Sequence, residues 1–220
     1  MSSKRAVLYV CAFAVAAFSA VAAPVHSKEL PLLHVANLCT DPSMDANDIV
    51  KQLVADGWSK VLPEESETAG RTLGDGSLLL THIATEADTL ATLREKAFVQ
   101  SLSRVKRKNT EYFFSATLRS PDAASIANVF WSKQGNRLQC TAATASRDEV
   151  ETLADRIAAM TDSGRQNDFG PSLHTRAATD KQHPFRVWLS VLKQDTIAMF
   201  SADPLVASVG LYAEYFPRRD

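Results

Sequence analysis

The residues of this chain best suited to chemistry are His174 and His183, which lie in one polar stretch of the sequence. An imidazole can act as a general base or bind zinc, but a metal site needs several ligands that converge. No two histidines of the chain share the spacing of a helix turn or of one face of a strand. We therefore predict no metal and no cofactor, and retain His174 and His183 as the candidate site of a hydrolase.

Other catalytic motifs in the sequence are weak. Ser-x-x-Lys occurs at Ser103–Lys106 and at Ser190–Lys193, but without the Ser-Asp-Asn and Lys-Thr-Gly motifs that accompany it in penicillin-interacting enzymes. The sequence contains neither Gly-x-Ser-x-Gly nor His-Glu-x-x-His. These observations favour a non-catalytic protein, although catalytic groups need not be adjacent in sequence.

The first 22 residues have the pattern of a cleaved Sec signal peptide. Lys4 and Arg5 precede an apolar run that ends in Ala20-x-Ala22, the small-x-small pattern of a signal peptidase site. Cleavage between Ala22 and Ala23 is therefore expected. An uncleaved anchor would need about 20 strongly apolar residues, whereas this run is rich in alanine. A lipoprotein would need small residues before Cys11, which follows Leu8-Tyr9-Val10 instead.

Removal of the signal leaves two cysteines, Cys39 and Cys140, separated by about 100 residues. In an oxidising compartment such a pair is most simply a structural disulfide. Redox catalysis usually employs cysteines close in sequence, as in Cys-x-x-Cys. We predict a Cys39–Cys140 disulfide, with free thiols as the alternative.

Composition limits the partners and the location of the mature chain. Loss of Lys4 and Arg5 leaves 22 basic and 25 acidic residues, a net charge of −3 that does not indicate a nucleic-acid partner. No second apolar stretch approaches membrane-spanning length, so no membrane span is expected after cleavage. The mature chain has no Asn-x-Ser/Thr sequon. We expect a soluble protein of the Gram-negative periplasm, or a secreted one.

A cluster of basic residues ends one predicted helix, at Arg104, Lys106, Arg107 and Lys108. Cations at this position complement the negative end of the helix dipole. A nucleic-acid patch is the alternative, and the net charge of the chain disfavours it.

Hydrophobic periodicity and turn residues divide residues 23–220 into the elements that must position these groups. A helix begins near Pro42 and ends at Gly57, a second runs from Glu86 to Lys106, and a third follows the capping box Ser146-Arg147-Asp148-Glu149. Loops are predicted at Pro63–Gly76 and Thr161–Pro184. Strands are predicted at Leu30–Leu38, Ser77–Ile83, Glu111–Leu118, Ile126–Ser132, Arg137–Ala145, Phe185–Leu192, Thr196–Ser201 and Val206–Phe216.

These elements predict a single α+β domain, with a mainly antiparallel sheet of about seven strands and three helices packed on one face. The last segment alternates as a strand does, although Asp203-Pro204 is compatible with a helix start. The predicted function is an exported, non-catalytic accessory or interaction protein that binds a protein or a component of the cell envelope. A periplasmic hydrolase with its site near the 161–184 loop is the alternative. A carrier of small ligands would require a large apolar cavity.

The signal-peptide interpretation predicts the mass of the exported protein. Expressed in full in a Gram-negative host, the soluble exported chain should begin at Ala23 because the small-x-small pattern ends at Ala22. Intact-mass spectrometry measures this directly. Recovery of a chain that retains Met1 in the membrane fraction would refute cleavage.

Overall fold

The structure is a computed structural model that describes residues 30–78, 89–148, 150–169, 171–179 and 184–216. The predicted signal segment, with Ala22 and Ala23, lies outside these residues, as does His183. Within the part of the chain that the structure describes, no helix is long and apolar enough to cross a membrane.

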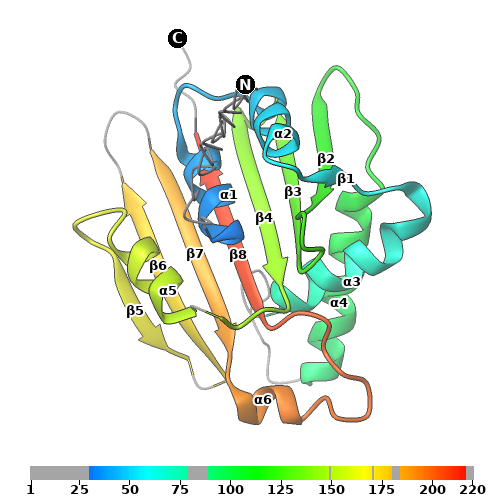
Figure 1. Ribbon diagram of the computed structural model, residues 1–220, viewed down its shortest axis with the longest axis vertical. Helices are drawn as coiled ribbons and strands as arrows, with labels where there is room; N and C mark the ends of the chain where they lie inside the picture. The colour runs from blue at the N-terminus through cyan, green and yellow to red at the C-terminus, as the bar shows by residue number, and fades with distance from the viewer. Residues whose placement is uncertain (1–29, 79–88, 149, 170, 180–183, 217–220) are drawn as a thin grey trace, which may run out of the picture.

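The described chain forms one domain built on an eight-stranded antiparallel sheet, in the order β1-β2-β3-β4-β8-β7-β6-β5 (Figure 1). The strands are β1 (Ser59–Lys60), β2 (Phe113–Arg119), β3 (Ser125–Ser132), β4 (Arg137–Thr144), β5 (Arg165–Asp168), β6 (Ser172–Thr179), β7 (Phe185–Leu192) and β8 (Val209–Tyr215). The helices are α1 (Pro31–Thr40), α2 (Ala46–Ala55), the 3₁₀ turn η1 (Pro63–Glu65), α3 (Ser66–Gly76), α4 (Leu90–Val105), α5 (Val150–Ala158) and α6 (Gln194–Ala198).

The α+β class and the antiparallel sheet are confirmed, but the placement of the helices on one face is wrong. Helices α1, α2 and α5 lie in front of the sheet in Figure 1 and pack with it in the main core, on what we call the first face. Helix α3 packs on the opposite, second face, where Leu73 meets Ile126 and Ala143. Because both faces are covered at the centre of the sheet, β4 is buried along its length from Leu138 to Thr144.

The predicted first strand, Leu30–Leu38, is instead the helix α1. Pro31 occupies its first turn, where a missing N–H costs little. The buried positions Leu32, Val35, Ala36 and Cys39 have the spacing of one helix face. A short apolar run does not distinguish a buried strand from a buried helix, which explains the error.

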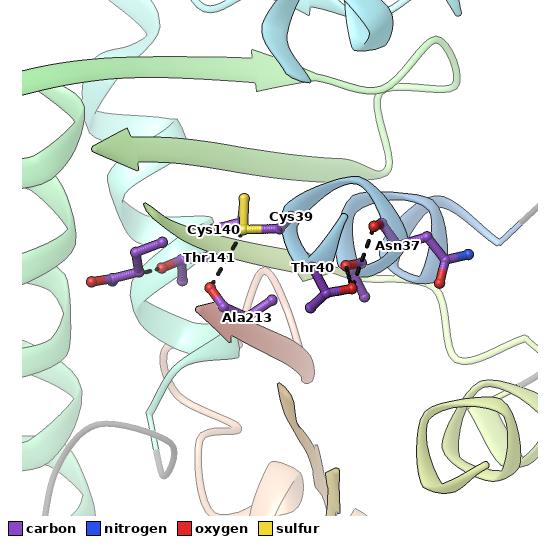
Figure 2. The surroundings of a disulfide bond; sticks show 8 residues. Asn37, Cys39, Thr40, Cys140, Thr141 and Ala213 are labelled. Atoms are coloured by element: carbon purple, nitrogen blue, oxygen red, sulfur yellow. Dashed lines mark hydrogen bonds between the residues drawn. A yellow bond between two sulfur atoms is a disulfide. The ribbon is translucent and has the colours of Figure 1, made fainter. Parts of the chain in front are cut away.

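Cys39, near the end of α1, is joined to Cys140 in β4 by a disulfide, as the sequence led us to expect. The two Cα atoms are 6.1 Å apart and both side chains are fully buried. Figure 2 shows that the Cys39 sulfur also faces the carbonyl oxygen of Ala213 in β8, at 3.6 Å. The bond therefore fixes α1 over the β4–β8 pair at the centre of the sheet.

Helix α2 begins four residues after the expected Pro42. Asp45 caps it, accepting hydrogen bonds from the backbone N–H groups of Asn47 and Asp48 at 2.7 and 2.9 Å. Its predicted end is correct, because Gly57 has a φ of +89°, a conformation that favours glycine. Trp58 then folds back into the main core.

The predicted loop Pro63–Gly76 is wrong, because this segment forms η1 and α3. Its glycines are points of close packing rather than turns. A Cβ on Gly70 would lie 3.1 Å from the Leu102 Cα, and one on Gly74 would lie 2.9 Å from the backbone nitrogen of Phe98. The two glycines thus let α3 approach the backbone of α4.

The C-terminal end of α3 makes an equally close contact with the sheet. A Cβ on Gly210 in β8 would overlap the carbonyl oxygen of Gly76, and one on Gly76 would lie 2.9 Å from the carbonyl oxygen of Val209. Only glycine at both positions permits this approach of two backbones. It sets the height of α3, and hence of α4, above the second face.

A buried ion pair fixes α3, α4 and the segment before β8 together. Asp75 is fully buried and receives the Arg94 guanidinium at 2.7 Å from Nε and 3.0 Å from Nη2. Its Oδ2 also accepts the backbone N–H of Val206 at 2.9 Å. Arg94 donates in addition to the Asp203 carbonyl at 2.6 Å. All of these groups are satisfied, so the pair is structural.

The second predicted helix is α4, and strands β2, β3, β4, β7 and β8 also lie where the sequence predicted them. The predicted strand Thr196–Ser201 is wrong, since α6 occupies its first half. Of the predicted strand Ser77–Ile83, residues 79–83 lie outside the described residues, and Leu78 is in a turn.

The predicted loop Thr161–Pro184 is also wrong, because most of it forms the β5–β6 hairpin at one edge of the sheet. Its strands lack a hydrophobic period. In β6 the buried positions carry Ser172, Thr175 and Ala177 rather than large apolar side chains, and β5 is exposed throughout. Polar strands at the edge of a sheet discourage pairing with strands of other molecules. Their sequences resemble those of loops, which explains the error.

Helix α5 follows the predicted capping box, whose Glu149 lies outside the described residues. The Ser146 hydroxyl accepts the backbone N–H of Asp148 at 3.2 Å. Leu153, Ala154 and Ile157 form the buried stripe that the sequence predicted.

The disulfide predicts a large loss of stability in Cys140→Ser. The bond closes a loop of 101 residues, so its removal should lower the free energy of unfolding by about 2–5 kcal/mol. Chemical denaturation measures the change, and adding reductant to the wild type should reproduce most of it. Equal midpoints with and without reductant would show that the bond does not form.

The Gly76–Gly210 contact predicts that Gly210→Ala destabilises the protein by about 1–3 kcal/mol, because α3 must move away from β8. Gly135→Ala is the matched control, since its Cβ would meet nothing closer than the Ser132 hydroxyl at 3.6 Å. Denaturation midpoints compare the two variants. A control as unstable as Gly210→Ala would refute the packing argument.

Candidate functional site

The C-terminal turn of α4 is held over strands β2 and β3 on the second face. The Ser115 hydroxyl donates to the Arg104 carbonyl at 3.1 Å, and the Asn128 amide donates to Ser115 Oγ at 3.1 Å. Asn128 also donates to Thr117 Oγ1 at 3.0 Å. This chain of hydrogen bonds fixes the side chains of the last helical turn relative to the sheet.

A groove of about 510 Å³ lies between this turn and strands β2, β3 and β4. We call it the arginine groove. Gln139 and Ser132 supply polar groups on its sheet side. Its lining includes three arginines and three phenylalanines: Arg104, Arg107, Arg137, Phe113, Phe130 and Phe216.

Arg104 is the most unusual of the three arginines. Its side chain is half-buried, and its guanidinium donates to Thr141 Oγ1 at 3.3 Å. Burial lowers the pKa of Arg104, and the nearby Arg137 and Arg107 lower the pKa further, against an opposing effect of Tyr212. Among the residues that the structure describes, no carboxylate forms an ion pair with it.

Arg94, on the same helix, shows the contrasting arrangement. Its guanidinium is paired with Asp75, whose hydrogen bonds are the largest cause of a raised pKa for Arg94. The buried guanidinium of Arg94 therefore has a carboxylate counter-ion, whereas the half-buried guanidinium of Arg104 has none among the described residues. A buried charge without a counter-ion is costly, and an added anion would offset the cost.

Arg137 approaches one carboxylate, which other groups share. Its Nη1 is 3.7 Å from Glu214 Oε2, while Arg186 Nη1 is 3.5 Å from Glu214 Oε1. Tyr212 donates its hydroxyl to Glu214 Oε2 at 2.9 Å. Burial, followed by the effect of Glu214, raises the pKa of Tyr212 to about 12, so this hydroxyl remains a donor at neutral pH. Glu214 is therefore committed to its own network, and the groove stays positive.

Arg107 is supported by aromatic rings at the rim of the groove. Its guanidinium carbon lies 5.6 Å from the Phe113 ring centre and 5.1 Å from that of Phe130. The two rings are stacked, with centres 6.1 Å apart. Cation–π attraction thereby orients the charge of Arg107 and provides an apolar wall beside it.

A second basic groove, of about 590 Å³, lies on the other side of the end of α4. Lys60, Lys106 and Lys108 line it. The predicted basic cluster is thus divided between two grooves. Arg107 lies just beyond the end of α4, where its backbone N–H donates to the Arg104 carbonyl at 3.2 Å in a turn that keeps the two residues close together.

The histidine candidate is less favourable for chemistry. The His174 Nε2 and Ser172 Oγ atoms are 2.7 Å apart, and the Phe169 ring lies 4.7 Å from the imidazole. Burial lowers the pKa of His174. However, Ser172 is fully buried, so its hydroxyl is not accessible to a substrate. His183 lies outside the described residues.

The two Ser-x-x-Lys motifs do not form catalytic pairs. Ser103 lines the arginine groove whereas Lys106 lines the second groove. Ser190 is buried in β7, and its hydroxyl has no hydrogen-bond partner in the described part of the chain. Lys193 is bound to both oxygens of Asp168 at 2.7 Å, so its ammonium is already paired. Among the described residues no cluster of three metal-ligating side chains occurs.

Comparison with known proteins gave no match to a protein family, to a curated protein or to a solved structure.

Proposed function

We propose that this chain is an exported, non-catalytic binding protein of the cell envelope, which binds an anionic group of its partner in the arginine groove. The observation that carries the proposal is Arg104, a half-buried guanidinium without a carboxylate partner among the described residues. Arg107 and Arg137 stand beside it in the groove.

An anion in the groove would supply what these arginines lack. Charge-assisted hydrogen bonds are stronger than neutral ones, and each contributes about 1.5–3 kcal/mol. In a partly buried groove the attraction is screened less than at an open surface. The wall of phenylalanines adds apolar contact for the rest of the ligand.

Export is supported by the disulfide and by the signal-like N-terminal sequence. Structural disulfides persist in oxidising compartments such as the periplasm. A nucleic-acid partner is not part of the proposal, because the mature chain carries a net charge of −3 and its basic side chains are local. Binding is preferred to hydrolysis because the serine beside His174 is inaccessible.

Removal of Arg104 tests the proposal. Sulfate, compared with chloride at equal ionic strength, should raise the thermal midpoint of the mature oxidised protein. Arg104→Gln should weaken sulfate binding at least about tenfold, since one charge-assisted hydrogen bond contributes about 1.5–3 kcal/mol. A titration of the midpoint with sulfate gives the affinity.

Arg165→Gln is the matched control, because it removes the same charge from an exposed position in β5, at the far edge of the sheet. Circular dichroism shows whether both variants remain folded. Equal effects of the two substitutions, or no response of the wild type to sulfate, would contradict binding in the groove.

A further inference from the structure

We infer that the anionic group bound in the arginine groove is a doubly charged phosphoryl oxyanion, carried as a phosphomonoester. The inference rests on the proposed function and deepens it by naming the chemistry of the ligand. It follows from the charge, the direction and the surroundings of the three arginines.

The charge of the groove exceeds what a single carboxylate balances. Three guanidinium groups line it, at Arg104, Arg107 and Arg137. Within the described chain, Glu214 is the carboxylate that an ion pair links to this set, and Arg186 shares it. At least two positive charges therefore remain uncompensated, which a dianion balances and a monoanion does not.

The donors also approach from two different elements. Arg104 extends from the last turn of α4, Arg107 follows just after the end of that helix, and Arg137 comes from the start of β4. A carboxylate has two oxygens in one plane and is satisfied by one guanidinium fork. A phosphoryl group presents three terminal oxygens in a tetrahedral arrangement, so it can accept from several forks at once.

The apolar wall indicates an ester rather than free phosphate. Phe113, Phe130 and Phe216 line the same groove as the arginines. Inorganic phosphate has no group to place against these rings. A phosphomonoester leaves its organic part beside them, where burial of apolar surface adds to the affinity.

Isothermal titration calorimetry of the mature oxidised protein tests the charge state. A phosphomonoester has a second pKa of about 6, so its dianionic fraction rises about tenfold between about pH 5 and pH 7.5. We expect glycerol 1-phosphate to bind about tenfold more tightly at the higher pH. Sulfate is dianionic throughout and should show no such change, which controls for titration of the protein.

Acetate provides the monoanionic comparison and should bind at least about tenfold more weakly than sulfate. Acetate binding as tightly as sulfate, or glycerol 1-phosphate binding independent of pH, would overturn the dianion while leaving an anion-binding groove. Failure of every anion to bind would overturn both this inference and the proposed function.

Inorganic phosphate separates the two sources of the phosphoryl group. Phenyl phosphate should bind more tightly than inorganic phosphate at pH 7.5, because its ring can lie against the phenylalanines, and Phe216→Ala should reduce that difference while sulfate binding is retained. Equal affinity for the two phosphates in the wild type would overturn the ester. Arg137→Lys keeps the charge but loses the planar fork, and should weaken phosphate binding several-fold.

Discussion

The close contact between Gly76 and Gly210 determines the arrangement of the second face. Two backbones meet there without intervening side chains, so the end of α3 lies directly on β8. Helix α4 in turn lies against Gly70 and Gly74 of α3. The position of α4 therefore depends, through α3, on the Gly76–Gly210 contact at the centre of the sheet. Its last turn contacts β2 through Ser115 and β4 through Thr141, both at Arg104.

The first face is fixed by a different means, a covalent bond. The disulfide holds α1 against β4, and the Cys39 sulfur lies close to the Ala213 carbonyl of β8 (Figure 2). Both faces are thus attached to the same pair of central strands. Side chains of β4 alternate between the two, so that Cys140 stabilises the first face and the adjacent Gln139 and Thr141 support the arginine groove.

Two arginines of α4, the buried Arg94 and the half-buried Arg104, have contrasting environments. Arg94 is neutralised by Asp75 and joins the segment before β8 to the helices. Arg104, near the other end, has polar and cationic neighbours but no carboxylate among the described residues. A purely structural arginine would be expected to have the first environment. The second environment is the one that motivates our proposal of anion binding at Arg104.

Much of the sheet could be predicted from the sequence because its strands alternate clearly and are bounded by turns, as in the β3–β4 hairpin and in β8. The helix α1 could not be predicted, since a short apolar run is compatible with either a buried strand or a buried helix. In α3, glycines that serve close packing have the same appearance as turn glycines.

Only part of the candidate site, the basic cluster with Arg104 and Arg107 at the end of α4, could be predicted from the sequence. Arg137 joins them only through the packing of α4 on β4, which depends on contacts distant in sequence. Conversely, the contact between His174 and the buried Ser172 arises because the two residues are two positions apart on β6, a strand in a segment that the sequence suggested to be a loop.

The central claim is that Arg104 is an anion-binding group, and arginine side-chain NMR tests it most directly. The ¹⁵Nε–Hε signals of the mature oxidised protein are followed while phosphate is added at constant ionic strength. We expect anion binding to cause a saturable shift of the Arg104 signal, whereas the signal of Arg94, bound to Asp75, stays in place and serves as an internal reference. An Arg104 signal that remains unchanged at saturating phosphate, or that moves together with Arg94, would contradict anion binding at Arg104.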